Sequence, residues 1–184
     1  MKNNKINIAL AIGLVLMTAT ARIVYREMHM FNFAPIAAIG LFSGAVIKDR
    51  RLAFLVALLS QFVADMYFQL FTNTPGFYGI SQLFTYGALL AVTFLGTRMN
   101  SIKALPVLGY TIAASTIFFI ISNLGVYACG WWGYSFNGFT TTYIMAIPFF
   151  KNTLAGDMIG SVFLFGGYFL LKQAFTTNMQ KAKA

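Results

Sequence analysis

The sequence predicts an all-α integral membrane protein, a compact bundle of six transmembrane helices with both termini in the cytoplasm. Three observations predict this fold class. Of the 184 residues, 59% are hydrophobic and only 9% are charged, whereas about 25% of the residues of a soluble domain are charged. The apolar residues form six runs close to the roughly 20 residues that a membrane-spanning helix needs. Lys and Arg residues lie between these runs with a strong bias to one side.

The six predicted helices make up one domain, residues 1–184. Their expected bounds are Ile6–Val24, Phe31–Ile47, Leu52–Phe71, Ile80–Gly96, Ala104–Gly125 and Thr153–Phe175. The sixth helix is expected to follow Asn152, because an Asn side chain caps a first helical turn and Pro148 disfavours an earlier start. Residues 126–152 are then expected to form a long loop.

The basic residues predict the orientation. Ten of the thirteen Lys and Arg residues fall on the side of the chain ends: Lys2, Lys5, Lys48, Arg50, Arg51, Arg98, Lys103, Lys172, Lys181 and Lys183. Only Arg22, Arg26 and Lys151 fall on the other side. Cytoplasmic loops carry the excess of Lys and Arg, so both termini are expected in the cytoplasm.

The first run has a second interpretation. The stretch "MKNNKINIALAIGLVLMTATA" has a basic start, an apolar middle and an Ala-Thr-Ala ending at Ala21, which is the pattern of a cleaved signal peptide. We expect a retained helix, because the apolar run is long enough to span a membrane. Cleavage would leave five helices in the same orientation.

Composition excludes several function classes. The net charge of +9 does not indicate nucleic-acid binding, because the basic residues lie between apolar runs and not on one face. The single cysteine, Cys129, allows no internal disulfide. Cys129 and His29 are the only soft metal ligands, so we expect no protein-only metal site. The sequence contains no phosphate loop or nucleotide motif, and no cofactor is predicted.

Polar residues gather in the outward halves of the predicted helices. Gln61, Asp65 and Gln69 are four residues apart and therefore share one face of the third helix. Asp65 is expected about 9 Å from the outer end of its helix, and Asp157 about 7 Å from that of the sixth. Carboxylates inside a bilayer usually face a partner, a cavity or a reaction. The alternative is that both only pair with Arg or Lys and fix helix registers.

Other polar groups follow the same distribution: Arg22, Arg26, His29, Asn32, Gln82, Tyr86 and Asn123. The inner halves of the helices offer only small hydroxyls such as Thr93 and Thr111. A channel or proton-coupled pump carries polar groups near the membrane midplane or through its full depth. The sequence therefore predicts a cup that is open to the outside.

An aromatic, glycine-containing segment is expected to cover this cup. The stretch "GVYACGWWGYSFNGF", residues 125–139, holds Trp131 and Trp132. Such rings can stack on a flat ligand, or they can form an ordinary aromatic belt at the membrane interface. Small residues four apart, as at Gly40 and Gly44, predict close helix approach.

Three stretches of the chain carry a resemblance to a known family. They are "NFAPIAAIGLFSGA" (Asn32–Ala45), "SNLGVY" (Ser122–Tyr127) and "YIMAIPFFKNTLAGD" (Tyr143–Asp157). With them the chain resembles the S-component superfamily, the substrate-capture subunits of energy-coupling-factor vitamin transporters. It looks closest to an uncharacterised bacterial membrane family of S-component-like proteins. The resemblance implies a bacterial cytoplasmic (inner) membrane location, a ligand pocket near the outer surface and a coupling-subunit docking face on the first helix, here at Ala9 and Gly13.

The leading hypothesis is capture of a small vitamin-like solute, or its precursor, for uptake. The residues expected to bind it are Arg22, Arg26, His29, Asn32, Asp65, Gln69, Asn123, Trp131, Trp132, Asn152 and Asp157. The basic residues are expected to meet an anionic group, the carboxylates a cationic or hydroxyl group, and the tryptophans a ring.

Two other hypotheses remain open. The protein could be a non-transporting scaffold or assembly subunit, with the aromatic segment as an interface anchor. It could also be an intramembrane hydrolase in which Asp65 and Asp157 share a proton and activate water. We expect no enzyme, because no familiar catalytic signature surrounds these carboxylates.

Overall fold

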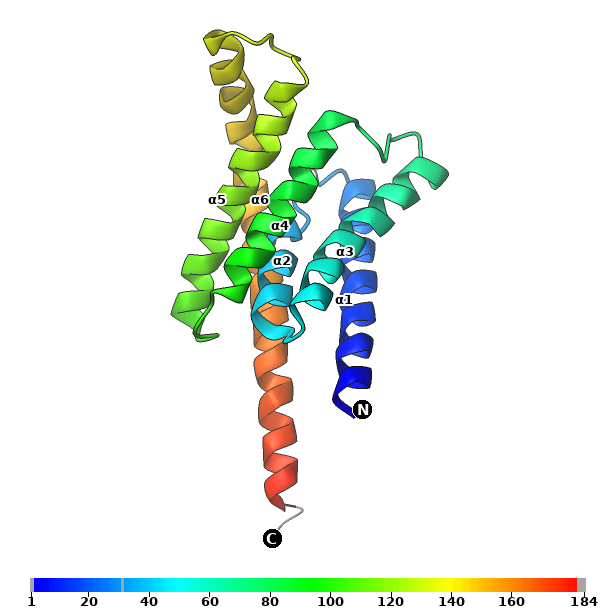
Figure 1. The fold of residues 1–184 in the computed structure, drawn as a ribbon, viewed down its shortest axis with the longest axis vertical. Helices are drawn as coiled ribbons and strands as arrows, with labels where there is room; N and C mark the ends of the chain where they lie inside the picture. Colours follow the sequence, from blue (N-terminus) through cyan, green and yellow to red (C-terminus); the bar gives the residue numbers. More distant parts are fainter. Residues whose placement is uncertain (1, 31, 182–184) are drawn as a thin grey trace.

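The computed structural model describes residues 2–30 and 32–181, and over these residues it is all-helical (Figure 1). The helices are α1 (Lys2–Glu27), α2 (Ile36–Val46), α3 (Arg50–Phe71), α4 (Ile80–Thr97), α5 (Ala104–Ala128) and α6 (Phe136–Lys181). By length and composition, α3, α4, α5 and residues 136–173 of α6 could cross a membrane. The start of α1 and the end of α6 lie at the same end of the bundle (Figure 1). The six predicted helices are therefore confirmed in number and order over the described residues.

The second predicted span is wrong in its length. Instead of a run from residue 31 to residue 47, α2 has only 11 residues, about 16 Å of helix. A helix of this length reaches about halfway across a hydrocarbon core of about 30 Å. The cause lies at its start, where Pro35 precedes the helix and the backbone of Asn32 adopts a positive φ of 58°.

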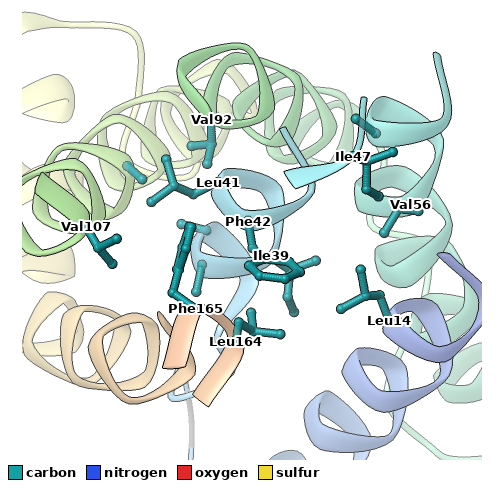
Figure 2. Packing of buried hydrophobic residues seen from close by; sticks show 14 of the residues in the cluster. Leu14, Ile39, Leu41, Phe42, Ile47, Val56, Val92, Val107, Leu164 and Phe165 are labelled. Atoms are coloured by element: carbon teal, nitrogen blue, oxygen red, sulfur yellow. The ribbon is translucent and has the colours of Figure 1, made fainter. Parts of the chain in front are cut away.

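The short helix α2 forms the centre of the bundle. It contacts each of the other five helices, and its residues from Ala37 to Gly44 are all buried. Figure 2 shows Ile39 and Phe42 of α2 among side chains of the surrounding helices, including Leu14 of α1 and Phe165 of α6. A largely apolar helix is stable in this position because every face meets another helix.

Glycine makes the contact between α2 and α4 possible. A methyl group added at Gly44 would lie 2.2 Å from the carbonyl oxygen of Thr93, and one added at Gly96 would lie 2.3 Å from that of Leu41. No side chain fits at such distances, so the two backbones touch directly. The close approach that the spacing of Gly40 and Gly44 predicted is present.

The sixth helix starts much earlier than predicted. It begins at Phe136 and continues through Pro148 for 46 residues, so the expected long loop and the expected cap at Asn152 are both wrong. In a bilayer, a continuous helix satisfies its own backbone hydrogen bonds, and a proline inside it is tolerated. The connection from α5 is consequently short, and it turns at Gly130 (φ 71°) and Gly133 (φ 77°).

Candidate functional site

A pocket of about 680 Å³ lies near the carboxyl-terminal end of α1, and this end of α1 is opposite to the chain ends in Figure 1. All six helices contribute to it. It is lined by Arg22, Arg26, Asn32, Ile36, Gln61, Tyr78, Ser81, Thr85, Phe118, Phe119, Ser122, Asn123, Val126, Cys129, Trp131, Ala146, Phe149, Phe150 and Thr153. Five of the predicted binding residues are among these: Arg22, Arg26, Asn32, Asn123 and Trp131.

Asp65 lies behind the wall of this pocket and does not line it. Its side chain is fully buried and forms an ion pair with Arg22, with 2.5 Å between Oδ1 and Nη1. Its other oxygen, Oδ2, accepts hydrogen bonds from Gln82 Nε2 and Tyr86 Oη, both at 3.0 Å. A buried carboxylate is stable only when it is paired and hydrogen-bonded in this way.

The same network holds Arg22 in place. Its Nη1 also donates to the backbone carbonyl of Gln61 at 3.3 Å, and its guanidinium lies 5.3 Å from the centre of the Phe68 ring. The Gln61 side-chain amide lies between the two charges. In one orientation it donates to Asp65, and turned over it accepts from Arg22. Asp65 therefore positions a partly exposed guanidinium at the pocket wall.

Asp157 has a different role, at the amino-terminal end of α2. Pro35 precedes that helix and offers no capping side chain. The carboxylate of Asp157 supplies the missing acceptor, because its Oδ1 accepts from the backbone N–H of Ala38 at 3.0 Å. Its Oδ2 accepts from Ser115 Oγ at 2.7 Å. Asp157 is fully buried, and it caps α2 from another helix.

Two glycines allow α6 to deliver this carboxylate. A methyl group at Gly156 would lie 1.9 Å from the carbonyl oxygen of Phe33, and one at Gly160 would lie 2.3 Å from Cβ of Pro35. One turn after Asp157 in α6, Ser161 accepts a hydrogen bond of 2.8 Å from Thr111 of α5. The Gly156 and Gly160 pair thus brings α6 against the segment that precedes α2.

Four other predicted binding residues lie outside the pocket lining. Gln69 accepts hydrogen bonds from the backbone N–H groups of Gly76 and Phe77, at 3.2 and 3.4 Å, and so anchors the α3–α4 connection. His29 is exposed just after α1, with a φ of 57°. Trp132 is 47% exposed, and Asn152 lies within α6. The structure brings none of the four to the pocket wall.

The roof of the pocket is partly aromatic. Trp131, in the α5–α6 connection, is 78% exposed, and Tyr78 enters from the α3–α4 connection. Burial raises the pKa of the Tyr78 hydroxyl above its usual value. At neutral pH Tyr78 therefore stays an uncharged donor or acceptor.

One wall of the pocket was not predicted from the sequence. It is formed by Ala146, Phe149, Phe150 and Thr153 of α6, whose spacing of three and four residues marks one helical face. Ala146, Phe149 and Phe150 were expected in the loop of residues 126–152 and only Thr153 in a helix, so their common helical face was not predicted. Phe150 packs on Phe119 of α5 with ring centres 4.8 Å apart, which joins this wall to the next.

Among residues 2–30 and 32–181, no group of three His, Cys, Asp or Glu side chains could hold a metal ion. The predicted docking face on α1 is described only in part. No atom lies within 4 Å of a methyl group placed at Gly13, and the side chain of Ala9 lies outside the described residues.

Comparison with known proteins identifies the family. The fold and the pocket define a multi-helix membrane protein with a cavity of mixed polar and apolar lining. The chain belongs to the DUF6580 family, a family of unknown function, which it matches over residues 2–180. No curated protein and no solved structure shows significant similarity to it.

Proposed function

We propose that this protein captures a small solute from outside the cell in the pocket between its six helices. The observation that carries the proposal is the pocket itself, at about 680 Å³. Ligand sites for small molecules typically measure about 300–1,000 Å³ and combine apolar walls with a few convergent polar groups. Here phenylalanine side chains form much of the wall, while arginine and asparagine side chains supply the polar groups.

The charges of the lining favour an anionic ligand. Arg22 and Arg26 both line the pocket, and no Asp or Glu is among the described residues that line it. Arg26 is exposed one turn further along α1, and arginine binds carboxylate and phosphate groups with paired hydrogen bonds. Trp131, Phe119 and Phe149 offer ring faces to a planar group. The ligand class is therefore a small anion that carries a ring, as several vitamins and their precursors do.

The wider role follows the resemblance to S-components. In this proposal the protein lies in the bacterial cytoplasmic membrane with both chain ends in the cytoplasm, as the bias of ten basic residues to three supports. Release of the solute inward uses a membrane coupling subunit that docks on α1 at Ala9 and Gly13. The open surface at Gly13 is compatible with such a contact.

The competing hypotheses have weaker support. A paired-carboxylate hydrolase needs two acids that reach one water, yet Asp65 is bonded to Arg22 and Asp157 to Ala38 and Ser115. A scaffold subunit does not need a ligand-sized cavity at its outer end. Solute binding accounts for the ligand-sized cavity and for the arginine residues that line it, which these two roles leave unexplained.

The single cysteine gives a direct test. Cys129 lines the pocket and is partly exposed, so a membrane-impermeant maleimide applied to intact cells reports both orientation and occupancy. We expect Cys129 to be labelled from outside, and a panel of anionic ring-bearing vitamins and precursors to contain one compound that slows labelling. Arg26→Gln is expected to weaken this protection about 10-fold or more, because hydrogen bonds to charged groups contribute about 1.5–3 kcal/mol.

Two control variants make the result interpretable. In a Cys129→Ala background, Tyr134→Cys places the only thiol on an exposed residue outside the pocket lining, and its labelling should not respond to ligand. Arg98→Gln removes a positive charge after α4, away from the pocket, and should leave protection unchanged. No protection by any compound of the panel, or equal protection of both thiols, would refute solute capture in this pocket.

A further inference from the structure

A second concavity lies at the other end of the bundle, between α5 and α6. It measures about 890 Å³. It is lined by residues of the α4–α5 connection, α5 and α6, among them Lys103, Val107, Val162, Phe165, Gly166 and Lys172. It shares no residue with the pocket described above, so solute capture does not account for it.

The groove is polar at one end and apolar along its length. Lys103 and Lys172 lie at the end nearest the α4–α5 connection, and both are exposed. Deeper in the groove, the hydroxyl of Thr111 donates a hydrogen bond of 2.8 Å to the hydroxyl of Ser161. These two polar groups therefore satisfy each other and do not require a polar group of the ligand. Among the residues that the structure describes, no acidic side chain lines the groove. An occupant with an anionic head and a hydrocarbon tail matches this division.

The length of the groove fits one leaflet of a bilayer. From Lys103 to Thr111 is eight residues of α5, about 12 Å, and from Lys172 to Met158 is fourteen residues of α6, about 21 Å. Half of a hydrocarbon core of about 30 Å is about 15 Å. The two lysines therefore lie where lipid headgroups lie when the groove follows an acyl chain.

We propose that this groove is a binding site for an anionic phospholipid, with the phosphate at Lys103 and Lys172 and one acyl chain along Val107, Val162 and Phe165. Basic pockets between transmembrane helices on the cytoplasmic side bind anionic headgroups. Both lysines belong to the side that the charge bias assigns to the cytoplasm. The site holds a structural lipid between α5 and α6, independently of any solute in the other pocket.

Two pairs of variants test the two halves of the site. For the headgroup, Lys103→Gln/Lys172→Gln is compared with Lys48→Gln/Arg50→Gln, which removes the same charge from exposed residues near α3 on the same side. For the acyl chain, Gly166→Phe is compared with Gly167→Phe. A Cβ atom added at either glycine meets no atom within 4 Å, but only Gly166 lines the groove. Both phenylalanine variants are therefore expected to fold.

The experiment is native mass spectrometry of the full chain released from nanodiscs of equal phosphatidylethanolamine and phosphatidylglycerol. We expect the wild type to retain phosphatidylglycerol preferentially. Lys103→Gln/Lys172→Gln should reduce that preference roughly 30-fold, since each basic residue near an anionic surface strengthens binding about fivefold. Gly166→Phe should lower retention of both lipids, while Gly167→Phe and the Lys48/Arg50 variant behave as wild type.

Three results would overturn the proposal. Equal retention of the two phospholipids by the wild type would remove the role of the lysines. Unchanged retention in Gly166→Phe would place the lipid elsewhere on the protein. A dimer that replaces the lipid adducts and is lost only in Gly166→Phe would assign the groove to a second copy of this chain.

Discussion

Replacing Asp157 tests the assignment of this carboxylate as the cap of α2. Asp157→Ala leaves two buried donors without their acceptor, the N–H of Ala38 and the hydroxyl of Ser115. An unsatisfied buried donor costs about 1–3 kcal/mol. Ser115 can turn to the carbonyl four residues earlier in its own helix, so most of the cost falls on Ala38. We expect a total loss of about 2–4 kcal/mol, made up of about 1–3 kcal/mol for the unsatisfied N–H of Ala38 and about 1 kcal/mol for the weakened hydrogen bond of Ser115.

The expected loss is large enough to measure by thermal unfolding. For a chain of 150–250 residues, 1 kcal/mol changes Tm by about 2–4 °C, so Asp157→Ala should lower Tm by roughly 5–15 °C. Circular dichroism at 222 nm in a mild detergent follows the loss of helix. Asp157→Asn keeps one acceptor oxygen for Ala38 and should cost about 1 kcal/mol, in the range of a weakened cap.

Asp49 provides the matched comparison. It caps α3 through the backbone N–H groups of Arg51 and Leu52, and it is exposed. Water can replace its carboxylate, so Asp49→Ala should cost about 1 kcal/mol. If Asp157→Ala lowers Tm by no more than Asp49→Ala does, the capping role is wrong. If it leaves Tm unchanged but abolishes ligand protection of Cys129, Asp157 is a binding residue.

Three further predictions concern other parts of the fold. Gly44→Ala should destabilise the protein by about 1–3 kcal/mol or more in the same melting assay, because the new methyl would lie 2.2 Å from the carbonyl oxygen of Thr93. In the control variant Gly87→Ala the new methyl meets no atom within 4 Å, so this variant should be neutral or slightly stabilising. Similar losses of stability in both variants would contradict the direct contact between the α2 and α4 backbones. Asp65→Leu should cost about 3–5 kcal/mol, since it leaves Arg22 without its buried partner, and Arg22→Met/Asp65→Leu should recover much of this loss, whereas additive losses would argue against the ion pair. Stability should fall as pH rises above about 10. Burial raises the pKa of Tyr78 in the folded protein, so the unfolded chain releases this proton at a lower pH than the folded chain does. Tyr78→Phe should reduce the slope of Tm against pH in this range, and an unchanged slope would show that Tyr78 ionises normally.

Much of the architecture could be predicted from the apolar runs. The bounds of α3, α4 and α5 differ from the prediction by only a few residues, because each run is long, apolar and flanked by polar or basic residues. The extent of α2 could not be read in this way. "NFAPIAAIGLFSG" is largely apolar on both sides of Pro35, so its hydropathy does not show that the helix begins only after this residue.

The part of the candidate site that the sequence predicted correctly is its pair of arginine residues. Arg22 and Arg26 are four residues apart at the carboxyl-terminal end of an apolar run, and both line the pocket. Depth alone did not distinguish the two carboxylates. Asp65 and Asp157 were expected at similar levels, yet one holds an arginine and the other caps a helix. The partner of Asp157 is 119 residues away in the sequence, and no local pattern identifies it.

That separation has a consequence for how the chain is made. The amino-terminal end of α2 leaves the ribosome early, but the carboxylate that satisfies it belongs to the last helix. The hydrogen bond from Ala38 to Asp157 can therefore form only after α6 has been synthesised, and a chain truncated before Asp157 lacks this cap of α2.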